Sequence, residues 1–190
     1  MQLLRGGAAR REFERFAADR TDRLLRTAYL MAPDLAEAED LVQETLLRVA
    51  RRWHKVRAMD HPAAYARRIL VNLVIDGAHG RARRNGELGG PVGPGGARWE
   101  EQPDSRAERD LRAVDTQATL LAALAGLSAR QRAVIVLRYW EDLPEAEVAA
   151  ILGCSVGTVK STASRGLARL REALNETPSG HRLGGTPAPR

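Results

Sequence analysis

A cluster of short polar and cationic side chains near the C-terminal end of the sequence has the composition of a DNA-binding surface. In a helix that begins after Ser155, these side chains lie on the face opposite Val159, Ala163 and Leu167. Such side chains can reach base edges and phosphates when their helix lies in the major groove, where a good bidentate base contact contributes roughly 1 to 3 kcal/mol. The residues predicted to bind DNA are Thr158, Lys160, Ser161, Ser164 and Arg165.

The segment before this face has the punctuation of a helix-turn-helix. Ser128 and Gln131 have capping-box spacing, which predicts a helix that starts there and runs to about Trp140. The residues 142–144 then predict a turn, because they include a proline that starts a new helix well.

A short second helix is predicted from the apolar residues Val148, Ile151 and Leu152, which share one face. Gly153 stands where a helix end often needs a left-handed residue, and Ser155 is the predicted N-cap of the next helix. The whole pattern predicts a helix-turn-helix over about 128–174. The alternative is a three-helix unit that contacts proteins and keeps its polar face in solvent.

The first half of the sequence predicts a bundle of amphipathic helices. Apolar residues recur at helical spacing over 13–31 and again over 36–53, and Pro62 is placed at the first turn of a third helix that continues to Leu73. No stretch shows the sustained alternation of a strand. The apolar stripe of the second helix consists of Leu41, Val42, Thr45, Leu46, Val49 and Trp53.

These patterns predict an all-α protein with two small helical domains joined by a Gly/Pro-rich flexible linker. The predicted boundaries are 10–84 for the first domain, 85–109 for the linker, 110–175 for the second domain and 176–190 for a disordered tail. The alternative is a single domain with an unusually long loop.

Composition limits the classes of function. The formal net charge of +6 suits a polyanionic partner, and Cys154 is the only cysteine, so a disulfide within the chain is excluded. No apolar run approaches the length that spans a bilayer, and we expect a cytoplasmic protein. Cys154 is expected to pack in its turn, with redox sensing as the alternative.

An enzyme is not predicted. The histidines do not have metal-ligand or catalytic-triad spacing, so we expect no catalytic group, no metal and no cofactor. The histidines are His54, His61, His79 and His181.

Three segments together resemble one protein family. The segment ARQRAVIVLRYWEDLPEAEVAAILGCSVGTVKSTASRGLARLRE resembles region 4 of sigma-70 factors, especially the small extracytoplasmic-function (ECF) group. AEDLVQETLLRVARRW resembles region 2.2, and HPAAYARRILVNLVIDGAHGRARR resembles regions 2.3 and 2.4. The VGTVKSTASRGLARLRE and ARRILVN patterns are most similar to the actinobacterial sigma-E-like subgroup.

The resemblance implies a promoter-specificity factor for RNA polymerase. Region 2.2 binds the polymerase clamp in the family, and the matching residues fall at i, i+3, i+4 and i+7, on one helix stripe opposite the core. These residues are Asp40, Gln43, Glu44 and Leu47. Regions 2.3 and 2.4 melt the minus-ten element, and region 4 reads the minus-thirty-five element. The expected partners are core RNA polymerase, promoter DNA and an anti-sigma factor, and we expect a monomer when the chain is free.

In the melting segment, an amide can contact a base edge and arginines can hold the displaced backbone. The predicted minus-ten residues are Arg67, Arg68, Asn72, Arg81, Arg83 and Arg84. Tyr65 and Asp76 match family positions but are expected to be structural. Two residues depart from the family pattern: Arg67 stands at a commonly aromatic place, and Thr162 stands where arginine is frequent.

The competing hypothesis is an ordinary DNA-binding regulator whose first half senses a signal or dimerises. It predicts tight operator binding without polymerase, whereas the sigma-factor hypothesis predicts weak promoter binding by the free chain.

Overall fold

The computed structural model describes residues 7–32, 34–85 and 117–176, without the side chains of 79–85 and 176. All regular structure in these ranges is helical, which confirms the predicted all-α class. The helices of the first half are α1 (Gly7–Met31), α2 (Leu35–Arg51), α3 (Trp53–Val56) and α4 (Pro62–Asn85). The second half contains a helix over 117–125, α6 (Ala129–Ile135), the π-helical η1 (Val136–Trp140), α7 (Glu145–Leu152) and α8 (Val156–Glu176).

Helix α2 begins and packs as its sequence predicts. Asp34 caps it, since the Asp34 carboxylate accepts a hydrogen bond from the Glu37 backbone N–H at 2.8 Å. Its apolar stripe turns into the first bundle, where Val42, Thr45 and Val49 are buried. The opposite face is left to solvent.

An aromatic cluster joins the N-terminal half of α1 to the start of α3. Trp53, which is 5 % exposed, lies under Phe13 and Phe16 of α1, with ring centroids 5.5 Å and 5.1 Å away. Aromatic rings in such edge-on and tilted arrangements add to the free energy gained by burying their area. The cluster therefore attaches the start of α3 firmly to α1.

Helix α4 crosses the bundle and starts at Pro62, as predicted. Its buried face consists of Ala66, Leu70, Val71 and Val74. The sequence predicted this helix to Leu73, and it continues further, to Asn85.

The capping box at the start of α6 is confirmed. The Gln131 N–H donates to Ser128 Oγ at 3.3 Å, and the Ser128 N–H donates to Gln131 Oε1 at 3.1 Å. One difference from the prediction is that the helix does not reach Trp140 as an α-helix. It widens to a π-helix at Val136, and the Glu141 N–H closes the last turn on the Val136 carbonyl at 3.0 Å.

The turn between α7 and α8 also follows the sequence. Gly153 ends α7 with a φ of 59°, a left-handed conformation that glycine adopts without steric cost. Ser155 caps α8 by accepting from the Thr158 N–H at 3.1 Å. Further along α8, Gly166 allows close packing, because a Cβ at this position would lie 3.1 Å from Ile135 Cγ1 of α6.

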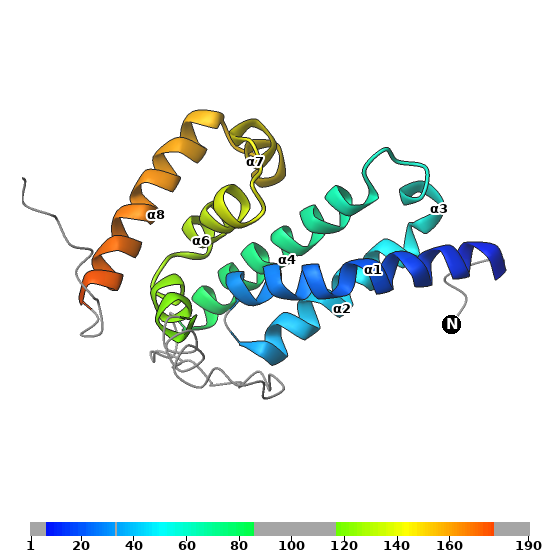
Figure 1. Cartoon of the computed structure of the whole chain (residues 1–190), viewed down its shortest axis with the longest axis horizontal. Helices are drawn as coiled ribbons and strands as arrows, with labels where there is room; N and C mark the ends of the chain where they lie inside the picture. The colour runs from blue at the N-terminus through cyan, green and yellow to red at the C-terminus, as the bar shows by residue number, and fades with distance from the viewer. Residues whose placement is uncertain (1–6, 33, 86–116, 177–190) are drawn as a thin grey trace, which may run out of the picture.

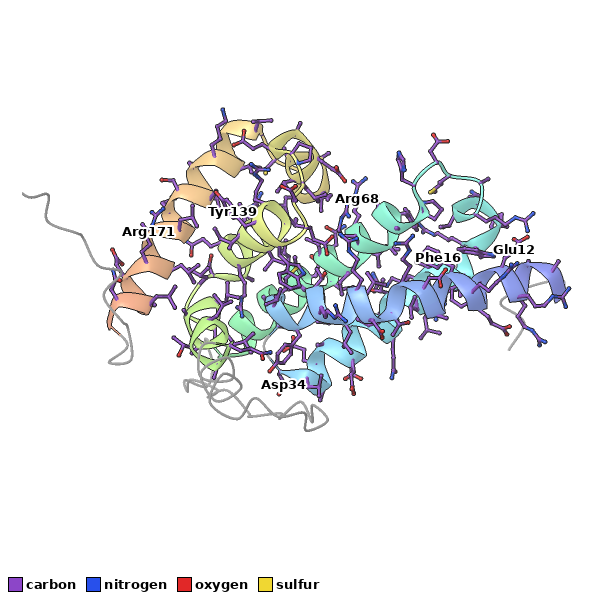
Figure 2. All side chains as sticks on the ribbon, viewed as in Figure 1. Glu12, Phe16, Asp34, Arg68, Tyr139 and Arg171 are labelled. Carbon is purple, nitrogen blue, oxygen red and sulfur yellow. The ribbon has the colours of Figure 1, made fainter. Side chains whose placement is uncertain are left out.

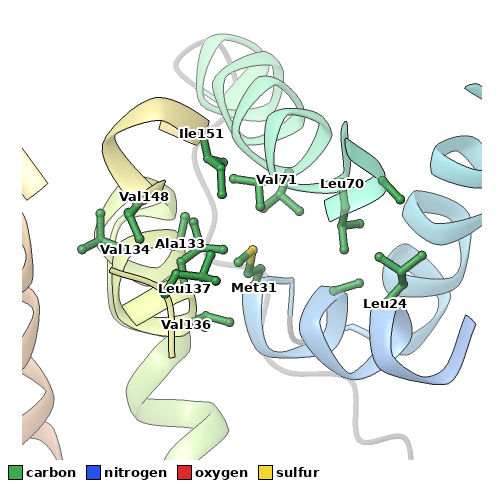
Figure 3. Packing of buried hydrophobic residues seen from close by; sticks show 14 of the residues in the cluster. Leu24, Met31, Leu70, Val71, Ala133, Val134, Val136, Leu137, Val148 and Ile151 are labelled. Atoms are coloured by element: carbon green, nitrogen blue, oxygen red, sulfur yellow. The ribbon is translucent and has the colours of Figure 1, made fainter. Parts of the chain in front are cut away.

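The two halves pack against each other (Figure 1), although the sequence between them, residues 86–116, lies outside the described residues. Helix α6 lies between α8 on one side and α1 and α4 on the other. Figure 3 shows Met31 of α1 and Val71 of α4 close to Val136, Leu137 and Ile151 of the second half. One continuous apolar core therefore includes both halves. The predicted linker and tail fall almost wholly outside the described residues.

Candidate nucleic-acid interface

The predicted DNA-binding face of α8 is open to solvent. All of its predicted residues are exposed, whereas Val159 and Ala163 are buried against α6 and α7. The hydroxyl of Ser161 donates to the Thr158 carbonyl at 3.1 Å, and Arg165 Nε donates to the Ser161 carbonyl at 3.2 Å. These local bonds hold polar side chains along the helix surface and leave the other guanidinium N–H groups of Arg165 available as donors.

Three residues that sequence reasoning did not single out lie beside this face. A shallow hollow between η1 and α8 is lined by Arg138, Tyr139 and Arg171 together with Lys160 and Ser164. Tyr139 is 56 % exposed (Figure 2). The Arg138 guanidinium lies 5.9 Å from the centre of its ring. Arg171 lies seven positions after Ser164 and so on the same face of α8, which the sequence could have indicated. Only the fold places Arg138 and Tyr139 of η1 beside that face.

Thr162 does not belong to this surface. It is 6 % exposed and lies on the inner side of α8, next to Ala163. Its departure from the family pattern therefore affects how α8 packs in this structure and not its outer face.

The stripe predicted on α2 lies opposite the buried residues of that helix. Asp40 and Gln43 are exposed, and Leu47 is 44 % exposed. Glu44 accepts from Arg48 Nε at 2.7 Å. The four side chains form one accessible surface with carboxylates around an apolar residue.

The predicted minus-ten residues on α4 fall into three groups. Arg68 (Figure 2) and Asn72 are exposed. Arg67 is turned toward the second half, with its side chain 15 % exposed and Nη2 2.5 Å from Glu147 Oε1. The side chains of Arg81, Arg83 and Arg84 lie outside the described residues.

The expected structural roles of Tyr65 and Cys154 agree with their positions. Both are partly buried against the core, and Arg52 Nη1 donates to the Tyr65 hydroxyl at 3.2 Å. Asp76 is exposed on α4. Among the described residues, no group of three His, Cys, Asp or Glu side chains is arranged to hold a metal ion.

Comparisons with known proteins place both halves in one family. The family models "Sigma-70 region 2" and "Sigma-70, region 4" match residues 18–85 and 117–170. The chain is 40 % identical over 163 residues to the RNA polymerase sigma-E factor of Streptomyces antibioticus, which covers 86 % of this chain and 84 % of that relative. It is 34 % identical over 154 residues to the ECF RNA polymerase sigma factor SigL of Mycobacterium tuberculosis, covering 80 % and 83 %.

The chain belongs to the ECF group of the sigma-70 family.

A solved structure of another sigma factor has a similar fold. The sigma factor RpoE of Bartonella quintana, in complex with the anti-sigma factor NepR, matches with a TM-score of 0.63 and 28 % identity over 87 % of this chain and 98 % of that one. In the present chain, region 2 comprises α2, α3 and α4 with most of α1. Region 4 contains α6, η1, α7 and most of α8. The α2 stripe and the α4 residues therefore lie in region 2, and the α8 face lies in region 4. In the part of the chain that the structure describes, no helix is long and apolar enough to cross a membrane.

Proposed function

We propose that this ECF sigma factor binds core RNA polymerase through the α2 stripe and directs it to promoters with two DNA-binding surfaces. In this proposal Asp40, Gln43, Glu44 and Leu47 bind polymerase, and the α8 face reads the minus-thirty-five element. Arg68 and Asn72, with the arginines at 67, 81, 83 and 84, open and hold the minus-ten element. The protein acts without catalysis of its own.

The observation that carries the proposal is the presence of two exposed and chemically different surfaces in one small chain. The α2 stripe is acidic and apolar and does not suit a polyanion, whereas the α8 face is polar and cationic and does. A regulator that needs only DNA has no evident use for the first surface. A factor that brings polymerase to DNA needs both.

Each DNA surface has only a handful of contacts, so the free chain is expected to bind promoters weakly. Attachment of both regions to polymerase makes the second contact effectively intramolecular, which raises its effective concentration. Regions 10–84 and 110–175 then act as two domains that residues 85–109 link. The cytoplasm is the proposed site of action, because polymerase and promoter DNA are there.

An anti-sigma factor is proposed as a further partner of this chain, because the similar sigma factor of Bartonella was solved in complex with one. The free protein is proposed to be a monomer.

The test is transcription with purified core polymerase and this protein on a library of genomic fragments. Discrete start sites that depend on the added protein are expected. If no protein-dependent start site is found, or if the protein alone binds an operator tightly and polymerase adds nothing, the chain is an ordinary regulator instead.

A further inference from the structure

A carboxylate of region 4 is buried in region 2. The side chain of Glu141, which directly follows η1, is 3 % exposed. Its Oε1 accepts from Thr27 Oγ1 at 2.6 Å, and its Oε2 lies 2.8 Å from Arg23 Nη2 and 3.6 Å from Arg67 Nη1. Glu141 and Thr27 are separated by 114 positions in sequence, so this contact exists only because the two regions are packed together.

Backbone geometry directs Glu141 inward. The π-helical turn of η1 ends on its N–H, and the next residue, Asp142, has a φ of 51°. A non-glycine residue in the left-handed region costs roughly 1 kcal/mol or more, so surrounding contacts must hold it there. Tyr139 and Trp140 just before it are exposed, whereas the Glu141 side chain points into the neighbouring region.

Arg67 joins two carboxylates of region 4. One amino group of its guanidinium lies 3.6 Å from Glu141 Oε2, and the other donates to Glu147 Oε1 at 2.5 Å. Each amino group already faces a carboxylate and the side chain is only 15 % exposed, so little of the guanidinium is accessible to a phosphate. Arg68 and Asn72, on the same helix, stay exposed.

The other functional surfaces are open in this packed arrangement. The α2 stripe and the α8 face are exposed, so polymerase and the minus-thirty-five element can be approached. Of the described residues assigned to the proposed functions, Arg67 is the one withdrawn from solvent by contact with the other region. The packed arrangement therefore restricts the minus-ten surface selectively.

We propose that Glu141 and Glu147 act as an internal latch that holds regions 2 and 4 together and occupies Arg67 in place of promoter phosphate. Contact of Arg67 with the DNA backbone requires the two regions to separate. The part of this inference that concerns DNA rests on the proposed function, whereas the latch itself does not.

The latch has a quantitative consequence. When only the separated form binds a ligand, the measured dissociation constant equals the intrinsic one divided by the separated fraction. Replacing glutamate by glutamine keeps an oxygen acceptor but removes the charge that strengthens the hydrogen bond, and this loss should raise a small separated fraction roughly tenfold. Binding of minus-ten single-stranded DNA to the free chain should tighten by the same factor.

The experiment uses the full chain and measures the distance between the regions directly. In a Cys154→Ser background, fluorophores are attached to cysteines that replace Asp19 of α1 and Arg169 of α8, both of which are exposed. Labelled proteins that carry Glu141→Gln or Glu147→Gln are compared with the labelled protein that keeps both glutamates. The Glu147 side chain is 40 % exposed, so its replacement should leave the fold intact even if Glu141→Gln lowers stability.

Glu172→Gln is the matched control, because it makes the same charge change on an exposed residue of region 4. Reduced energy transfer in both latch variants but not in Glu172→Gln supports the latch, as does a parallel increase of about tenfold in affinity for a minus-ten oligonucleotide. Unchanged transfer in both variants overturns it, and so does an equal effect in the control. Separation without tighter DNA binding overturns the role assigned to Arg67. Because transfer is measured without polymerase or DNA, failure of the transcription assay would leave this result interpretable.

Discussion

Lys160 of α8 and Glu145 of α7 form an ion pair across the helix-turn-helix, with 3.6 Å between Nζ and Oε2. The pair lies at the edge of the proposed DNA surface, where Glu145 neutralises a cation that would otherwise face phosphate. Exposed pairs of this kind contribute little to stability, so the acidic residue is expected to influence DNA binding more than folding.

Glu145→Gln should strengthen promoter binding by the holoenzyme roughly two- to fivefold, because Lys160 loses its competing partner. The dissociation constant for a promoter fragment at fixed salt is the measurement. Glu172→Gln again controls for net charge. Equal gains in the two variants would show that the effect is not local to Lys160.

Lys160→Ala and Arg165→Ala should weaken binding to all promoters to a similar extent if these residues contact phosphate alone. Each lost phosphate contact lowers the slope of log affinity against log salt by about 0.9. Holoenzyme binding to several promoters over a range of salt concentrations measures this slope. An unchanged slope, or losses confined to one promoter, would assign base contacts to these residues instead.

Ser161→Ala should alter sequence preference instead, if its hydroxyl reads a base edge. A lost base contact changes discrimination at one position by roughly 1 to 3 kcal/mol, with little change in salt slope. Selection of bound sequences from a randomised minus-thirty-five library measures this preference. An unaltered preference would remove Ser161 from the reading surface.

The double variant Asp40→Ala, Glu44→Ala should lose affinity for core polymerase while it keeps its thermal stability, because both side chains lie on the outer face of α2. Co-purification with core polymerase and a thermal melt are measured on the same preparation. Asp19→Ala is the control, because Asp19 is also acidic and exposed but lies on α1 and outside the stripe. This variant should bind polymerase as the unchanged protein does. Unimpaired polymerase binding by the double variant would show that the α2 stripe is only a solvated face.

Gly153→Ala should lower the free energy of unfolding by about 1 kcal/mol, since an L side chain disfavours the φ of 59° found there. No atom within 4 Å would meet the new Cβ, so the effect isolates backbone strain. Gly157→Ala, at an ordinary helical position in α8, should not destabilise the chain. Denaturant unfolding of both variants measures the difference, and equal stabilities would argue against strain at Gly153.

Local signals in the sequence were enough to predict most of the helix-turn-helix. The capping box at Ser128, the left-handed Gly153 and the cap at Ser155 depend on neighbours within a few positions, and all three are confirmed. The side of α2 that becomes core follows from helical periodicity in the same way. Such features are decided by bonds and side-chain spacing that the sequence contains directly.

The sequence also predicted which side chains of α8 are exposed, but not what lies beside them. The π-helical turn at Val136 replaced the expected α-helical end and determines where Arg138, Tyr139 and Glu141 point. Residues of η1 and α8 meet in the hollow because of how α6 packs on α8. No local pattern in the sequence indicates that meeting.

By itself, then, the sequence determined the helices, their caps, the two family regions and the exposed stripes of α2 and α8. Only the tertiary structure decided that regions 2 and 4 share a core, and that Arg67 lies between Glu141 and Glu147. The physical reason is range: helical periodicity and capping act over a few residues, whereas a buried ion pair forms only where packing brings distant segments together and excludes water.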